Sequence, residues 1–401
     1  MKEFKSFVMG GFECADQING SGNRINLLKE TQHDTRVEED YRELKELGML
    51  TVREGICWSL VEPRPGYYDF DEVLNRIQSA QKYGIEQIWD IIHFGYPDDI
   101  YPTHPKFTAR FVALCEAFTI FYFTHSPTEL RLIPINEISY ISWLSGEIGG
   151  AAPFITKYGW ELKYLLCKSA IQGIKAIRSI RPTVEVYLVE PLIWVHPWEI
   201  LDIPQAELEN SYQFQAADII MGKICPELGG SPELIDGVGV NYYWNCQWKL
   251  QFGTLPWPDL QNHRKPISEL LQLVWERYKK PLFFSETGHF GSGRAEWMEE
   301  IYHETSKAIA LGVDIRGICI YPLVDRPNWD HLEIYHNSGL WDLSENKDRI
   351  PVLLYVEAIQ DGLKLFESRI KSLMGNSYPT SNQTLDSTSN EIQDYPQPEG
   401  L

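Results

Sequence analysis

The sequence predicts a single (β/α)8 barrel, and three observations lead to this fold class. Short apolar runs rich in β-branched residues alternate with amphipathic helical patterns between residues 7 and 325. There are eight such runs, and eight parallel strands that alternate with helices are the layout of this barrel. A doubly wound open sheet is the main alternative. Against it, no G-x-G-x-x-G motif follows the first run, and the glycine-containing stretch 20–24 is too short to count as one.

The predicted strands are short, and several of them are apolar on both faces. Parallel strands have this pattern because other elements cover both of their faces. In chain order, the eight runs are 7–14, 50–58, 86–94, 130–137, 184–191, 237–244, 281–286 and 316–325.

Helical patterns lie between these strands. Gly48 and Gly84 each follow the last apolar residue of a pattern, where glycine commonly ends a helix. The clearest predicted helices are 37–48, 70–84, 160–180 and 295–312.

The composition changes after residue 372. The stretch 373–401 is rich in Ser, Thr, Asn, Gln and Pro and has almost no apolar periodicity. Such a segment cannot bury enough apolar surface to fold. The sequence therefore predicts one barrel domain over 1–372 and a disordered polar tail over 373–401.

The overall composition excludes several classes of partner. The 401 residues carry a formal net charge of −20, which disfavours binding to nucleic acid or to an anionic membrane surface. No run of about 18 apolar residues is present, so we expect no membrane span. The N-terminal residues lack the apolar core and the cleavage site of a signal peptide, and this indicates a cytoplasmic protein.

The cysteines do not form a recognisable site. There are seven, an odd number, and they are scattered with no C-x-x-C pair and no close grouping with histidine. This pattern favours reduced, mostly buried thiols over a disulfide framework or a structural zinc site. We expect no metal and no cofactor.

Reactive side chains follow several of the predicted strands. Glu137 ends the fourth strand and Glu286 ends the seventh, whereas His93 ends the third and Arg53 lies within the second. The carboxyl ends of barrel strands meet at one mouth, so these side chains should lie together. Two carboxyl groups about 5–5.5 Å apart suit glycoside hydrolysis with retention of configuration, one as nucleophile and the other as acid/base. Glu190, which ends the fifth strand, is interpreted as a polar wall of the same pocket.

These segments resemble the clan A glycoside hydrolases, and most closely glycoside hydrolase family 1, the β-glucosidases and their relatives. Asn136-Glu137 resembles the N-E-P motif of that family, and residues 283–288 resemble its T-E-N-G motif. The resemblance extends over residues 8–345. It implies that Glu137 is the acid/base and Glu286 the nucleophile. It also implies that Arg53 and Tyr243, which lie in matching segments, orient and support the nucleophile.

The same resemblance implies a set of sugar ligands. Gln17 lies in a segment similar to the first strand of the family, and His93 lies in a segment similar to its H-W-D-x-P motif. Asn136 would bind the 2-hydroxyl group of the sugar. Trp329 would stack under the sugar ring.

Five positions depart from the family pattern. Ile138 follows Glu137 in place of the proline of N-E-P, and Thr287 follows Glu286 in place of the asparagine of T-E-N-G. Asn328 stands where the family has the glutamate that grips the distal sugar hydroxyls, and Tyr321 and Phe94 each replace a tryptophan. The departures leave both glutamates in place, so the resemblance implies preserved catalysis with an altered sugar preference. Asn328 and Tyr321 are expected to face the substrate.

The predicted function is therefore a retaining β-glycosidase that acts on a small carbohydrate or glycoside of the β-glucoside or β-galactoside type. Two alternatives stay open. A transglycosidase would pass the sugar to an alcohol acceptor in place of water. A non-catalytic sugar-binding barrel would also be compatible with the changes at Ile138, Tyr321 and Asn328.

Overall fold

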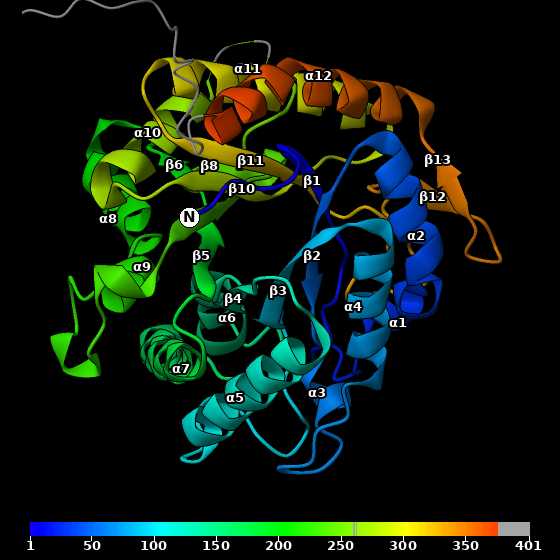
Figure 1. Cartoon of the computed structure of the whole chain (residues 1–401). Coiled ribbons are helices and arrows are strands. Elements are labelled where there is room, and N and C mark those ends of the chain that lie inside the picture. The colour runs from blue at the N-terminus through cyan, green and yellow to red at the C-terminus, as the bar shows by residue number, and fades with distance from the viewer. Residues whose placement is uncertain (260, 262, 376–401) are drawn as a thin grey trace, which may run out of the picture.

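The computed structural model describes residues 1–259, 261 and 263–375. Its centre is a closed barrel of parallel strands in the order β1-β11-β10-β7-β5-β4-β3-β2, with helices around it (Figure 1). The predicted (β/α)8 fold is confirmed. Most of the predicted tail, 376–401, lies outside the described residues, and 373–375 belong to the last helix rather than to a tail.

All eight predicted strands are present. Each lies within or next to its predicted range, but six of the ranges are too long at the carboxyl end, because the residues there leave the sheet and form the loops of the mouth. The barrel strands are β1 Val8–Gly11, β2 Thr51–Gly55, β3 Glu86–Ile92, β4 Arg131–Ile135, β5 Glu185–Pro191, β7 Gly237–Asn241, β10 Leu282–Thr287 and β11 Ile315–Ile320.

Two small sheets lie outside the barrel. One is antiparallel and pairs β12 Trp341–Leu343 with β13 Arg349–Pro351. The other joins β6 Trp194–His196, β8 Gln247–Lys249 and β9 Gly253–Thr254. Neither sheet was predicted from the sequence.

The four predicted helices are also confirmed. Gly48 and Gly84 follow two of them in the left-handed conformation, with φ of 88° and 73°. The longer helices are α2 His33–Leu47, α4 Asp71–Tyr83, α5 Phe107–His125, α7 Gly159–Ile180, α8 Ile203–Tyr212, α10 Ile267–Tyr278, α11 Arg294–Ala310 and α12 Leu353–Gly375. The shorter α-helices are α1 Leu27–Glu30, α3 Trp58–Val61, α6 Ile138–Ile141 and α9 Gln215–Ile220.

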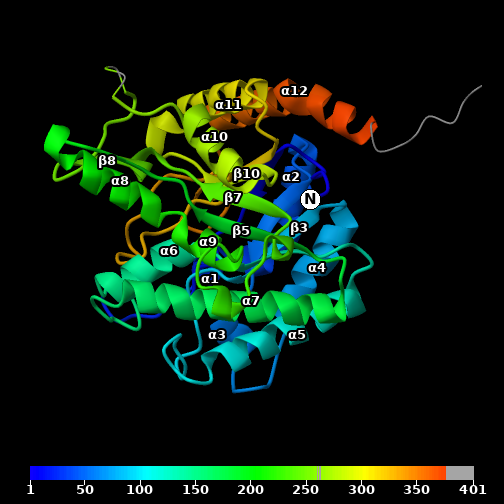
Figure 2. The same ribbon diagram turned by 90° about the vertical axis from the view of Figure 1, so that its left-hand side faces the viewer.

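Helix α5 is apolar on every side. In the part of the chain that the structure describes, it is the one helix long and apolar enough to cross a bilayer. It lies in the outer layer of the barrel beside α7 (Figures 1 and 2) and buries Phe111, Leu114 and Phe118 there. This packing accounts for the apolar residues on the buried side of the helix, whereas Ile120 is 56% exposed. The cytoplasmic location stays a prediction.

Large side chains fill the end of the barrel that lies opposite the mouth. Phe4 packs edge-on against Tyr187 and Phe283, with ring centroids 5.9 and 5.4 Å away. Met9 and Ile88 are buried in the same cluster, which is separate from the larger core of the molecule. Because apolar side chains fill this end, a reactive site is expected at the mouth, at the carboxyl ends of the strands.

A buried network of charges fixes α2 and α4 to the barrel. His33 Nδ1 lies 2.7 Å from an oxygen of Asp40, and its Nε2 lies 2.9 Å from an oxygen of Glu54. Glu54 on β2 also accepts a hydrogen bond from Arg76 at 2.7 Å, and Arg349 pairs with Asp40. All five side chains are fully buried, so each charge depends on its partners.

Glu54→Gln is expected to lower the free energy of unfolding by about 3–5 kcal/mol, because it leaves buried cations without their counter-charge. Urea denaturation measures the loss. Glu38→Gln is the matched control, since Glu38 pairs with Lys82 between the same two helices but on the surface. It should leave stability nearly unchanged. Equal stability of the two variants would contradict a structural role for the buried network.

Candidate active site

The predicted catalytic residues come together at the mouth. Arg53 lies on β2, Glu137 lies two residues after the end of β4, and Glu286 lies on β10, the seventh strand of the barrel along the chain. Glu286 is paired in register with Asn241, the last residue of β7. Asn136, which precedes Glu137, forms a parallel β-bridge with Val189 of β5. Parallel pairing therefore brings strand ends that are far apart in sequence to one side of the barrel.

Arg53 organises the site through all five of its N–H donors. Nη1 donates to Glu286 Oε1 at 2.6 Å and to the Ser285 carbonyl oxygen at 3.1 Å. Nη2 donates to Asn136 Oδ1 at 2.7 Å. The remaining donors, on Nε and Nη2, bind Asp90 at 3.1 and 2.7 Å. A guanidinium group with five satisfied donors has one orientation, so it presents a fixed edge to Glu286.

Glu286 is held at both carboxylate oxygens. Oε1 accepts from Arg53, and Oε2 accepts from the Tyr243 hydroxyl at 2.8 Å. The side chain is buried at 5% exposure. The guanidinium group and the phenol hydroxyl therefore fix the position and orientation of the Glu286 carboxyl group, as a nucleophile requires.

Glu137 has a different environment. Its backbone is left-handed, with φ of 48°, and its amide donates to the Val189 carbonyl oxygen at 3.0 Å. Its Oε1 accepts from Asn241 Nδ2 at 2.9 Å. Burial and the charge on Glu286 raise the pKa of Glu137 to about 8, even though the bond from Asn241 acts in the opposite direction. The raised pKa favours the protonated form of Glu137, which can donate a proton.

Glu190 lies behind Glu137. Its carboxylate accepts a hydrogen bond from the Ser139 amide at 3.0 Å, and so holds the turn that follows Glu137. Burial raises the pKa of Glu190 to about 7, against the hydrogen bond from Ser139 and the charge of Lys163. The sequence interpretation of Glu190 as a polar wall was therefore incomplete, because this residue also braces the first turn of α6.

Asn136 offers an unused donor. Its Oδ1 accepts from Arg53 and, at 3.3 Å, from Asn241 Nδ2. Its Nδ2 is buried without any hydrogen-bond partner. A buried amide nitrogen without a partner is costly, and a ligand hydroxyl would satisfy it.

His93 is already bonded at both ring nitrogens. Nδ1 lies 2.7 Å from Asp90 Oδ2, and Nε2 lies 2.9 Å from the Tyr321 hydroxyl. Glu13 Oε1 lies 3.5 Å from the same Nε2, and the second oxygen of Glu13 pairs with Arg326 at 3.0 Å. Although burial opposes it, the bond from His93 and the charge of Arg326 lower the pKa of Glu13 to about 2. A sugar hydroxyl at His93 would have to compete with Tyr321.

The remaining predicted sugar ligands lie around the mouth. They differ in whether their polar atoms are already bonded within the protein. Trp329 packs against Phe94, with ring centroids 5.0 Å apart, and its buried Nε1 has no hydrogen-bond partner. Gln17 lines a small cavity together with Phe94. Asn328, in contrast, is occupied within its own loop: Oδ1 accepts from the backbone amide of Asp330 at 2.8 Å, and Nδ2 lies 3.3 Å from His336 Nε2.

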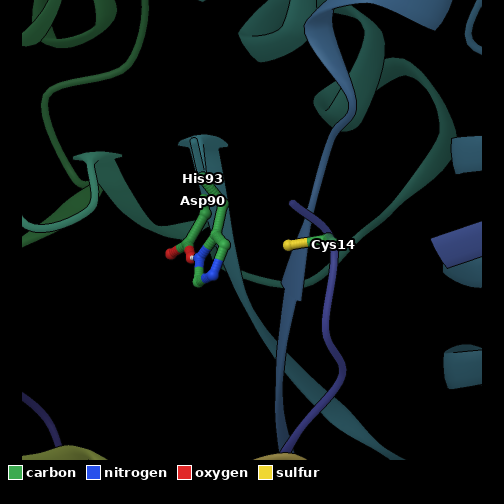
Figure 3. Close-up of side chains that lie close together, drawn as sticks. All are labelled: Cys14, Asp90 and His93. Carbon is green, nitrogen blue, oxygen red and sulfur yellow. Dashed lines mark hydrogen bonds and ion pairs between the residues drawn. The ribbon is translucent and has the colours of Figure 1, made fainter. Parts of the chain in front are cut away.

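A cluster of possible metal ligands lies beside the site. Cys14, Asp90 and His93 place one ligand atom each within 4.8 Å of one another (Figure 3). The donor set does not fit a cation, because Asp90 already binds Arg53 through both oxygens and binds the Nδ1 of His93. Burial also raises the pKa of the Cys14 thiol to about 11, which disfavours the thiolate that a metal needs.

Sequence reasoning missed Asp90 and Glu13. Each is a buried acid in or next to a predicted strand, at 1% and 3% exposure. An acid within an apolar strand was the available signal, as in the run Trp89-Asp90-Ile91. His93 lies only three residues after Asp90, but Arg53 lies 37 residues from Asp90 and Arg326 lies 313 residues from Glu13, so the sequence alone did not identify these contacts.

The comparisons bear on the fold. No family model matches this sequence. Its structure is similar to that of a family 1 β-glucosidase from Thermotoga maritima, at a TM-score of 0.74 and 16% identity over 91% of this chain and 99% of that one. The complexes of the Thermotoga maritima enzyme with cyclophellitol and with deoxynojirimycin match over the same shares at 16% identity, with TM-scores of 0.74 and 0.73. This chain thus has the fold of a family 1 β-glucosidase.

Proposed function

We propose that this protein is a retaining β-glycosidase, and that it is a divergent member of clan A close to family 1. The observation that carries the proposal is the unequal pair of glutamates in one mouth. Glu286 accepts hydrogen bonds from Arg53 and Tyr243 at its two oxygens, whereas burial and the charge on Glu286 raise the pKa of Glu137 to about 8. Two carboxyl groups with such different partners suit a nucleophile and an acid.

The reaction follows from these roles. Glu286 attacks the anomeric carbon while Glu137 gives its proton to the departing glycosidic oxygen, so that the bond to the leaving group breaks and an ester to Glu286 forms. Glu137, now ionised, takes a proton from water, and that water attacks the anomeric carbon. The ester breaks, the sugar leaves with its original configuration, and both glutamates return to their starting states.

Several groups could hold the sugar. The unused amide of Asn136 suits a hydroxyl close to the reacting carbon, since the same residue touches Arg53. The ring face and free N–H of Trp329 suit stacking on a sugar, and Gln17 contributes a further amide at the mouth. The occupied side chains of His93, Tyr321 and Asn328 support a sugar preference that differs from that of the β-glucosidases.

The comparisons support a sugar-like ligand. The Thermotoga maritima enzyme is described in complexes with deoxynojirimycin, castanospermine and glucoimidazole. We infer that a small carbohydrate or glycoside occupies the same mouth in this chain.

A substrate screen tests the proposal. Aryl β-glucosides and β-galactosides are incubated with wild-type protein, and proton NMR follows the anomer that is released first. We expect release of the β-anomer by wild type and none by Glu286→Ala. Initial release of the α-anomer would contradict retention. With methanol added, methyl β-glycoside as the main product would favour a transglycosidase, and binding without turnover by calorimetry would favour a sugar-binding barrel.

A further inference from the structure

Asp90 is a buried acid with no assigned role. It lies on β3, is 1% exposed, and faces Arg53 on the adjacent strand. Its Oδ1 accepts from Arg53 Nε at 3.1 Å, and its Oδ2 accepts from Arg53 Nη2 at 2.7 Å. Oδ2 also lies 2.7 Å from His93 Nδ1. Figure 3 places the Asp90 and His93 side chains against each other.

The two bonds to Asp90 determine which edge of Arg53 reaches Glu286. The carboxylate takes the Nε and Nη2 edge side-on, a planar arrangement with two parallel bonds. The N–H groups that remain are the second one on Nη2, which binds Asn136, and the two on Nη1, which bind Glu286 Oε1 and the Ser285 carbonyl oxygen. Without the Asp90 carboxylate, the Arg53 guanidinium group would lose the two bonds that hold its Nε and Nη2 edge and could rotate.

We propose that Asp90 is a positioning residue for the nucleophile: it clamps Arg53 in one orientation and shares the positive charge of Arg53 with Glu286. This inference rests on the proposed function, because Glu286 must be the nucleophile for the position of Arg53 to matter. Asp90 itself touches Arg53 and His93 and acts on the reaction through Arg53.

The charges around Asp90 predict a sign for its effect. The charged or titratable groups that face it are Arg53 on β2, His93 after β3, Cys14 after β1 and, across Arg53, Glu286 on β10. Glu13 and Tyr321 lie on the far side of His93. Arg53 thus stands between two carboxylates. When one carboxylate becomes neutral, the full positive charge of Arg53 acts on the other carboxylate. That carboxylate then becomes a weaker base and a weaker nucleophile.

Asp90→Asn separates charge from shape, because the amide oxygen can still accept from Arg53. We expect kcat/KM for an aryl β-glycoside to fall on the order of 10- to 100-fold, with KM little changed. The acidic limb of the pH profile of kcat/KM should move to lower pH by about one unit. Asp90→Glu, which restores the charge at a longer reach, should move the limb back toward that of wild type.

A second measurement does not depend on turnover. In protein labelled with carboxyl-13C glutamate, the Glu286 resonance is assigned by its loss in Glu286→Gln and is titrated by NMR. In Asp90→Asn, its titration midpoint should fall by about one pH unit. Glu185→Gln is the matched control, because Glu185 is a buried acid that pairs with Arg131 at the opposite end of the barrel. It should not move the midpoint even if it lowers thermal stability.

The two hypotheses fail in different ways. If wild type hydrolyses no glycoside, the proposed function fails, while the NMR titration still tests the link from Asp90 to Glu286. If the Glu286 midpoint in folded Asp90→Asn equals that of wild type, the positioning role of Asp90 is wrong, whatever the activity.

Discussion

Glu286→Ala is expected to lower kcat for an aryl β-glycoside on the order of 10⁵-fold, because it removes the group that forms the covalent intermediate. The fold should survive. Removal of the side chain leaves Arg53 with Asp90 and Asn136 as partners, and Tyr243 at the partly exposed mouth. Stopped assays with a dinitrophenyl glycoside measure the loss.

Chemical rescue distinguishes loss of a nucleophile from general damage. Azide is small enough to occupy the space of the missing carboxylate and to attack the anomeric carbon from the same side. The product would be the α-glycosyl azide, since only one displacement occurs. Residual activity close to wild type, or rescue by azide to a β-glycosyl azide, would contradict Glu286 as the nucleophile.

Glu137→Gln is expected to lower kcat/KM on the order of 10²- to 10⁴-fold for substrates with poor leaving groups, because their oxygen needs the proton of Glu137. Dinitrophenyl glycosides leave without that proton and should be affected far less in the first step. The pH profile gives an independent test. Burial and the charge on Glu286 raise the pKa of Glu137 to about 8, so wild-type activity should fall as the pH rises through 8.

In Glu137→Gln this alkaline limb should be absent. Glu190→Gln should move the limb to lower pH, since it removes a like charge that helps to raise the pKa of Glu137. Glu147→Gln is the control, because Glu147 lies exposed at the end of the short π-helix Ser142–Glu147 that follows α6. An alkaline limb that persists in Glu137→Gln would assign the acid to another residue.

The fold could be predicted largely from sequence, and the reason is visible in particular elements. A barrel strand such as β10 is covered on both faces, so the run Leu282–Phe284 is apolar and Glu286 interrupts it where the mouth begins. Helix α5 could not be recognised from amphipathic periodicity, because its own apolar residues are spread around the helix axis. Helices α10 and α12 were likewise not singled out.

The candidate site also has features that could be predicted from the sequence and features that could not. The positions of Glu137 and Glu286 at the mouth could be predicted, because each lies at or just after the end of its own strand. The bond between His93 and Tyr321 joins residues 228 apart in sequence, and the clamp of Asp90 on Arg53 depends on the register between β2 and β3. No local pattern contains either contact. The expected sugar contact of Asn328 also depends on its loop, where neighbouring amides take its oxygen.

The left-handed backbone of Glu137 has a consequence for the history of the chain. A residue with a side chain is disfavoured there by roughly 1–2 kcal/mol, whereas glycine adopts the same φ of 48° freely. The barrel alone would therefore favour glycine at this position, and only the carboxyl group gives a reason to keep glutamate. In a lineage released from selection for activity, Glu137 would be replaced long before the surrounding strands lost their apolar character.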